Sequence, residues 1–253
     1  MPHIIVDASS VHYRVSKRAA ESAPAAVCVH GSGADSVVWA YQVSRLSSRF
    51  RIIAPDLPGH GRSEGNALGS AEAYALWLYR FARELELGPF FLMGHSFGGA
   101  IVQEYARRYA HKLKGIVLAA TGTKFKLSRA YRELHESGAN VQNLEVAAIP
   151  DDIRQGYDLL KRVSGPLLHA DLLAAGAFDS SGWISSLAVP ALVLWGSSDF
   201  ITERELPESL YRQMSNASFH VIEGAAHVLM VDAPNAFNAA VSEFMERYAG
   251  ACG

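Results

Sequence analysis

The sequence has little cysteine and no long apolar run. Among its 253 residues there are two cysteines, Cys28 and Cys252, too few for the disulfide framework of a small secreted domain and compatible with a reducing compartment. No window approaches the roughly 18 uninterrupted apolar residues that predict a membrane span. The N-terminus does not combine a basic segment with a long apolar run, so no signal peptide is expected. We therefore expect a cytoplasmic protein without a membrane span.

An excess of charge of one sign is also missing. Lysine and arginine number 23 against 25 aspartates and glutamates, for a formal net charge of −2. Nucleic-acid binding usually needs a strong basic footprint, so we expect no nucleic-acid partner. No histidine and aspartate cluster with metal-ligand spacing accompanies Asp56, so we expect no metal and no cofactor. The pattern leaves the oligomeric state open between monomer and homodimer.

What the sequence does contain is an alternation of short apolar runs and segments of helical periodicity. With 49% hydrophobic residues, the chain can build one full-sized core. Near-continuous apolar runs are typical of strands buried on both faces of a parallel sheet. The expected strands are 3–7 and 11–16, paired as an antiparallel hairpin, followed by 24–29, 51–55, 90–93, 113–120, 189–195 and 218–222. The expected helices of this part are 36–48, 70–87, 100–109, 204–214 and 233–248. The alternation predicts an α/β fold with a mostly parallel eight-stranded sheet and helices on both faces.

The alternation stops between residues 124 and 186, where no strand-like run occurs. Short helices are expected there instead, at 128–137, 142–149, 151–164 and 166–175. A single crossover between parallel strands needs only about a dozen residues, so this block is several times too long for one. We expect a helical lid, 124–186, inserted in a core formed by 1–123 and 187–253. Ordinary crossover helices are the alternative.

A serine stands in a sharp turn at the end of one expected strand. Gly94-His95-Ser96-Phe97-Gly98 follows an apolar run and precedes a helical segment, which is the context of a nucleophile elbow. The glycines permit a turn that larger side chains would obstruct. We expect Ser96 at positive φ, beside a helix N-terminus that favours developing negative charge. The alternative is a glycine-rich turn that contains serine by chance.

Two further polar residues follow later strands. Asp199 and His227 each stand just after an expected strand, and the carboxyl ends of parallel strands share one edge of the sheet. Ester attack needs a base that titrates near neutrality and a carboxylate that orients it, so Ser96, His227 and Asp199 form a candidate triad. Asp179 and Asp232 are rival candidates for the acid.

Four motifs resemble those of the α/β-hydrolase family, and the resemblance covers nearly the whole chain. They are His30-Gly31-Ser32-Gly33, the turn from Asp56 to Ser63 (DLPGHGRS), Gly94-His95-Ser96-Phe97-Gly98-Gly99, and the pair Gly196-Ser197-Ser198-Asp199 with Gly224-Ala225-Ala226-His227. The resemblance implies that Ser96 is the nucleophile, His227 the general base and acid, and Asp199 the orienting acid. It also implies an oxyanion hole made by the backbone N–H groups of Ser32 and Phe97. Histidines 30, 60 and 95 would hold loops in place.

Nucleophile identity narrows the implied activity. Relatives resembling haloalkane dehalogenases and epoxide hydrolases carry aspartate at the elbow, so Ser96 argues against both. The chain is most similar to small-lid carboxylesterases, such as the pimeloyl-carrier methyl esterase group, and to C–C bond hydrolases. Our first hypothesis is a serine hydrolase that cleaves a carboxylic ester with an apolar acyl part through an acyl-enzyme. The alternatives are a C–C bond hydrolase of vinylogous diketones, a thioesterase or lactonase, and a non-catalytic ligand receptor on the same fold.

Indications of the substrate are few. The candidates for an apolar pocket, besides Phe97, are Trp39, Phe125, Tyr131, Phe200, Val228 and Leu229. A plain core role is at least as good an interpretation for all of these except Phe97 and Val228, which adjoin the candidate triad. Basic residues at the start of the lid favour either an acyl-carrier-bound substrate or, more simply, a solvated helix face. The expected partner is a small-molecule ester.

Overall fold

The protein is described by a computed structural model that covers residues 2–20, 22–125 and 165–250. The helices expected at 128–137, 142–149 and 151–164, and the candidate pocket residue Tyr131, lie outside the described residues.

Within these residues, eight strands form one sheet in the order β1-β2-β4-β3-β5-β6-β7-β8. The strands are β1 (His3–Val6), β2 (Ser9–Val15), β3 (Ala25–Val29), β4 (Arg51–Pro55), β5 (Phe90–His95), β6 (Leu113–Ala119), β7 (Ala191–Gly196) and β8 (Ala217–Ile222). β1 pairs antiparallel with β2, and β2 with β4; every later pairing is parallel. The predicted mostly parallel sheet with an N-terminal hairpin is confirmed.

The described helices begin and end close to the expected positions. They are η1 (Ser36–Trp39), α1 (Ala40–Arg45), α2 (Ala71–Glu84), α3 (Phe97–Tyr109), η2 (Ala110–Lys112), α6 (Gly165–Gly176), η5 (Ile184–Ser186), α7 (Glu205–Gln213), α8 (Leu229–Asp232) and α9 (Pro234–Ala249). The helix expected at 36–48 is divided into a 3₁₀ turn and a short α-helix, and α8 was not anticipated. α3 begins at Phe97, earlier than expected, because the chain turns into the helix directly after Ser96.

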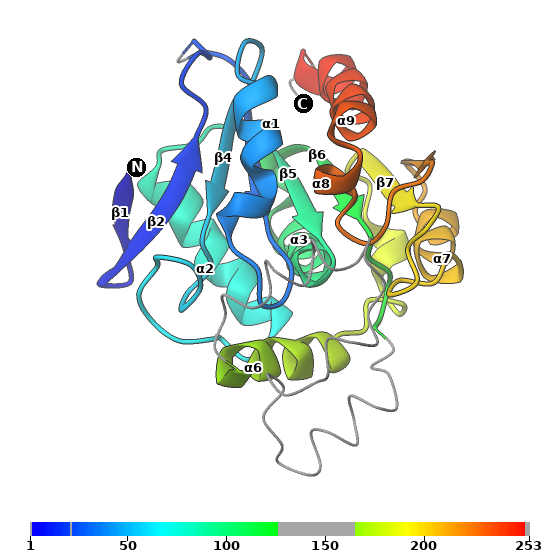
Figure 1. Cartoon of the computed structure of the whole chain (residues 1–253), viewed down its shortest axis with the longest axis horizontal. Helices are drawn as coiled ribbons and strands as arrows, with labels where there is room; N and C mark the ends of the chain where they lie inside the picture. The colour runs from blue at the N-terminus through cyan, green and yellow to red at the C-terminus, as the bar shows by residue number, and fades with distance from the viewer. Residues whose placement is uncertain (1, 21, 126–164, 251–253) are drawn as a thin grey trace.

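Two hydrophobic clusters cover the two faces of the sheet (Figure 1). One contains the apolar sides of α2, α3 and α7, and the other those of α1, α8 and α9. Alternate residues of each central strand enter opposite clusters: Val27 and Leu92 face the first, Cys28 and Met93 the second. Two-sided burial explains why these strands are continuously apolar in the sequence.

The chain on the two sides of Ser96 is packed backbone against backbone. A Cβ atom added to Gly94 would lie 2.3 Å from the carbonyl oxygen of Gly98, and one added to Gly98 would lie 2.4 Å from the carbonyl oxygen of Val29. Neither obstacle is a flexible side chain, so β3, β5 and the first turn of α3 approach as closely as they do only because both residues are glycine.

Gly98→Ala should therefore destabilise the fold. Overpacking of this kind costs about 1–3 kcal/mol of unfolding free energy, measured by urea denaturation. Gly182→Ala is the matched control, since a Cβ there meets nothing within 4 Å, and it should change stability by less than about 0.5 kcal/mol. Equal stability of the two variants would contradict the close packing of the turn.

Candidate active site

Ser96 stands at the carboxyl end of β5 in a strained backbone conformation. Its φ is 53° and its ψ is −121°, a combination that costs a non-glycine residue on the order of 1–3 kcal/mol and is concentrated at functional sites. The Ser96 N–H donates to the carbonyl of Ala119 at 2.9 Å, and the Gly99 N–H donates to the Ser96 carbonyl at 2.8 Å. The backbone thus holds the side chain at the start of α3, where the first N–H groups of the helix have no intrahelical acceptors.

The loop after β3 lies directly against this serine. A Cβ on Gly31 would be 3.1 Å from the Cβ of Ser96. Ser32, the next residue in the loop, therefore also lies close to Ser96. His30 holds the loop: its Nδ1 lies 2.9 Å from the Gly31 carbonyl, and its Nε2 accepts from the Leu57 N–H at 3.0 Å. Burial lowers the pKa of His30 to about 4, so the ring is neutral and donates through Nδ1.

Asp199 and His227 are in direct contact. The Asp199 Oδ2 lies 3.0 Å from the His227 Nδ1, and the Asp199 side chain is fully buried while that of His227 is 13% exposed. The other carboxylate oxygen accepts the N–H groups of Ile201 and Thr202, each at 2.9 Å. The acid is therefore oriented by its own turn, with one oxygen left for the imidazole.

The rival acids occupy other positions. Asp179 accepts hydrogen bonds from the N–H and hydroxyl of Ser181 on the surface. Asp232 accepts from the N–H of Ala226 at 3.1 Å. The Asp199 carboxylate contacts a ring nitrogen of His227.

His95 connects the loop that carries His227 to the turn that carries Ser96. Its Nε2 lies 2.9 Å from the carbonyl oxygen of His227 and donates to it, and the two rings are 4.8 Å apart. Burial, followed by the nearby His227, lowers the pKa of His95 to about 3, so this ring stays neutral. Because His95 directly precedes Ser96, the contact brings the loop of His227 beside the serine.

Thr202 is a further residue of the site that the sequence analysis did not identify. Its hydroxyl donates to the carbonyl of Ala120 at 3.1 Å and lies 3.5 Å from the His227 Nδ1. The side chain thereby connects the end of β6 to the turn of Asp199. The only local signal was the position of Thr202 three residues after an aspartate, where an N–H to carboxylate turn is common.

The turn at 56–63 is held by a buried carboxylate. Asp56 accepts the N–H groups of Ser36 at 2.8 Å and Arg62 at 2.9 Å, and lies 2.7 Å from the His12 Nδ1. Burial by itself would raise the pKa of Asp56, but these hydrogen bonds lower it overall. Asp56 is thus a structural anion, and no metal is needed to explain its burial.

The candidate pocket residues are distributed unevenly. Trp39 and Leu229 are fully buried in the second hydrophobic cluster, and Phe125 is partly buried against Phe178. Phe200 is 55% exposed beside Asp199, and Val228 is half-buried next to His227. A pocket role for these residues stays a prediction.

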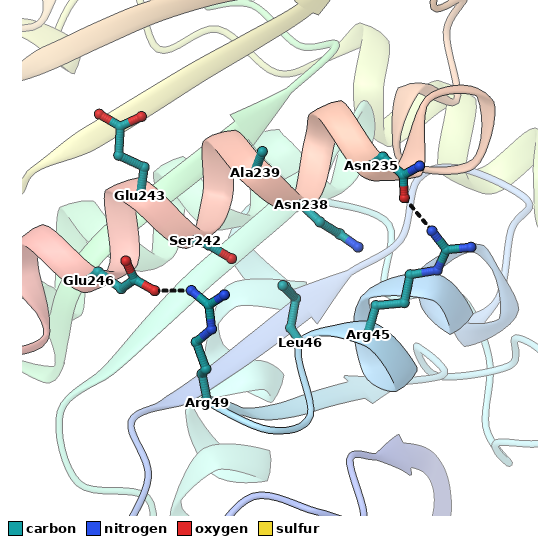
Figure 2. Close-up of a pocket in the computed structure, with 9 residues that line it drawn as sticks. All are labelled: Arg45, Leu46, Arg49, Asn235, Asn238, Ala239, Ser242, Glu243 and Glu246. Carbon is teal, nitrogen blue, oxygen red and sulfur yellow. Dashed lines mark hydrogen bonds and ion pairs between the residues drawn. The ribbon is translucent and has the colours of Figure 1, made fainter.

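A separate surface pocket of about 430 Å³ lies between α1 and α9 (Figure 2). Arg45 reaches from one side to Asn235 and Arg49 to Glu246. None of the candidate site residues lines it. The described residues also contain no cluster of three or more His, Cys, Asp or Glu able to hold a metal ion, and no helix long and apolar enough to cross a membrane.

Residues 26–240 match the model of the alpha/beta hydrolase family. The chain belongs to this family. This alpha/beta hydrolase is 29% identical over 243 residues to the pimeloyl-[acyl-carrier protein] methyl ester esterase of Sodalis glossinidius. The alignment covers 87% of this chain and 93% of the relative.

Solved structures share the fold of this alpha/beta hydrolase. An enol-lactonase from Burkholderia xenovorans LB400 superimposes with a TM-score of 0.85 at 23% identity, covering 97% of this chain and 100% of that one. A thermophilic esterase from Thermogutta terrifontis has a TM-score of 0.84 at 24% identity, covering 98% of each chain. At these identities the likeness concerns the fold.

Because His30 and His95 are buried as neutral rings with lowered pKa values, we expect the alpha/beta hydrolase to lose stability in acid. Between about pH 6.5 and pH 4 the unfolded chain protonates its histidines, whereas folded His95, whose pKa is lowered to about 3, does not. The stability that this neutral ring contributes is present above about pH 6.5 and falls by up to about 1.4 kcal/mol per pH unit below it.

His95→Asn should flatten the decline of unfolding free energy with falling pH, measured by urea denaturation at a series of pH values. The exposed His111 supplies the control, His111→Asn, which should keep the wild-type slope. An unchanged slope in His95→Asn would show that the buried ring is not the source.

Proposed function

We propose that this alpha/beta hydrolase is a carboxylesterase that cleaves an ester with an apolar acyl part through an acyl-enzyme on Ser96. The observation that carries the proposal is a strained serine whose neighbour His95 contacts the backbone of an oriented histidine, His227. Ser96 has φ 53°, and His227, whose Nδ1 is 3.0 Å from the buried Asp199, belongs to a loop tied to the elbow through His95. Such a constellation suits nucleophilic attack on a carbonyl carbon.

In the proposed mechanism, His227 accepts the Ser96 hydroxyl proton through Nε2 as the oxygen attacks the ester carbonyl. Asp199 keeps the proton of His227 on Nδ1 and stabilises the imidazolium that forms. The Ser32 and Phe97 N–H groups stabilise the oxyanion. The imidazolium then protonates the departing alcohol, and the same histidine activates the water that releases the acid.

The ester class is supported by the named relative, whose substrate is the methyl ester of a pimeloyl chain on an acyl-carrier protein. The pimeloyl chain is largely apolar. Phe97 and Val228, which adjoin Ser96 and His227, are apolar side chains that could contact an acyl chain of this kind. A small-molecule ester and a carrier-bound ester are both within the proposal, and they differ in the acyl part, which in the second case is attached to the carrier protein.

We also propose the division into a core, 1–123 and 187–253, and an inserted lid, 124–186. Contacts at the base of the insertion support it. Lys124 and Asp179 form an isolated antiparallel bridge, and the Ser180 N–H donates to the Thr123 carbonyl at 2.8 Å. The Ser180 hydroxyl also donates to Gln103 of α3 at 2.7 Å. The two ends of the insertion are therefore side by side and fastened to the helix that follows Ser96.

Ser96→Ala and His227→Ala should each lower kcat for p-nitrophenyl butyrate by about 10⁴-fold or more, because neither variant can form the acyl-enzyme efficiently. Initial rates of the purified variants provide the measurement. Wild-type turnover by Ser96→Ala would refute the proposed function.

The choice of acid is tested by a matched pair. Asp199→Asn should lower kcat by about 10⁴-fold, since an amide stabilises the wrong imidazole tautomer. Asp179→Asn, which alters an exposed acid bonded to Ser181, should leave kcat within about twofold. The reverse result would transfer the acid's role to Asp179.

The bond cleaved is tested by comparing kcat/KM for p-nitrophenyl esters of increasing chain length, a thioester, a lactone and a vinylogous diketone. Each methylene buried by the acyl pocket should raise kcat/KM by about fourfold until the pocket is filled. Faster cleavage of the diketone than of every ester would favour a C–C hydrolase instead.

A further inference from the structure

A third buried carboxylate lies close to the candidate oxyanion hole, on α6. Asp171 is 1% exposed. Its Oδ2 accepts the Gly33 N–H at 3.1 Å and lies 2.7 Å from the His60 Nε2, and its Oδ1 accepts the Tyr74 hydroxyl at 2.9 Å. These three partners come from three different segments of the core, whereas Asp171 itself belongs to the proposed lid.

Two of the partners of Asp171 adjoin the proposed oxyanion donors, and the third packs against the start of the oxyanion loop. Gly33 directly follows Ser32 in the loop, and the ring of His60 lies 5.0 Å from that of His30, which begins the same loop. The ring of Tyr74 packs edge-to-face on Phe97, with centroids 5.7 Å apart. One carboxylate is thus connected to both sides of the hole.

A buried carboxylate is an expensive way to pack a helix onto a core, since apolar residues of similar size are often as stable or more so. Here the charge is balanced by donors. His60 has an oxygen beside each ring nitrogen, the Pro58 carbonyl at 3.0 Å from Nδ1 and the Asp171 carboxylate at 2.7 Å from Nε2, so both nitrogens face hydrogen-bond acceptors. Burial, and next the Asp171 charge, raise the pKa of Tyr74, which keeps its hydroxyl a donor.

Gly33 is the partner through which this carboxylate acts on the loop. Its φ is 63°, a left-handed conformation that turns the chain directly after Ser32. The loop also closes on itself, since the Ala34 N–H donates to the Gly31 carbonyl at 3.2 Å. The Asp171 carboxylate therefore fixes the peptide group after Ser32, and the bond to the Gly31 carbonyl fixes the one before it.

We propose that Asp171 is a positioning residue: it connects the lid helix α6 to the oxyanion loop and holds the Ser32 N–H in the orientation that stabilises the oxyanion. Asp171 does not touch the substrate. This inference rests on the proposed function, because it assigns Asp171 to the same reaction.

Asp171→Ala removes the acceptor and should lower kcat for p-nitrophenyl butyrate by about 100-fold with KM within about threefold, since the oxyanion exists only in the transition state. Asp171→Asn should restore most of kcat, because its amide oxygen can accept the Gly33 N–H while its NH₂ group faces the Tyr74 hydroxyl. Rates are referred to folded enzyme, quantified by circular dichroism.

Ala174→Gly is the control for loss of stability in α6, because Ala174 is buried and has only a methyl side chain. It should lower Tm while kcat per folded enzyme stays within about twofold. If Asp171→Ala has the same kcat as this control, Asp171 only stabilises the fold and the inference is overturned.

The double variant His60→Leu/Asp171→Leu covers the case in which Asp171→Ala does not fold, since replacing both members of a buried hydrogen-bonded pair by apolar side chains can be nearly neutral for stability. It should remain folded with kcat at least 30-fold below wild type, a margin on the order of the loss expected for a misplaced donor. Wild-type kcat in this double variant would overturn the inference.

Ser96→Ala, measured beside these variants, separates the two proposals. If it keeps wild-type turnover, the proposed function itself has failed. If it is inactive while Asp171→Ala keeps full kcat, only the role of Asp171 has failed.

Discussion

The direct contact between the backbones of β5 and α3 is the constraint on which the rest of the site depends. Because Gly94 and Gly98 have no side chains, the end of β5 and the first turn of α3 can lie directly against each other on the two sides of Ser96. Ser96 itself has a strained backbone, with φ 53°. The turn lies between its neighbouring strands: the Val29 carbonyl of β3 packs against Gly98, and the Ala119 carbonyl of β6 accepts the Ser96 N–H. The parallel sheet therefore supports the backbone conformation of Ser96.

Three buried carboxylates surround the turn of Ser96, and burying a charge costs free energy that apolar packing would not. Asp56, Asp171 and Asp199 are almost fully enclosed, and each accepts at least one backbone N–H from a loop at the carboxyl edge of the sheet. Buried charges of this kind are tolerated only when fully hydrogen-bonded. Three carboxylates thus hold the loop of Gly33, the turn at 56–63 and the turn that follows β7 through backbone N–H groups.

Local patterns predicted most of the fold, because strands buried on both faces are continuously apolar and the elbow requires glycine at fixed spacing. The order of Ser96, Asp199 and His227 predicted a triad, and the described contacts support it. The contact of Asp171 with Gly33 was not anticipated, since the two residues are 138 positions apart and neither belongs to a local motif. α8 was missed because a helix of four residues leaves no periodicity to detect. The roles of the residues stay predictions.

The central claim is that the strained Ser96 hydroxyl is the nucleophile. The most direct measurement is peptide mapping by mass spectrometry after reaction of the folded protein with a fluorophosphonate. We predict one phosphonyl group per chain, on the peptide that contains Ser96, formed in the folded protein and not after unfolding in urea. Labelling of another residue, or equal labelling of the unfolded chain, would contradict the account.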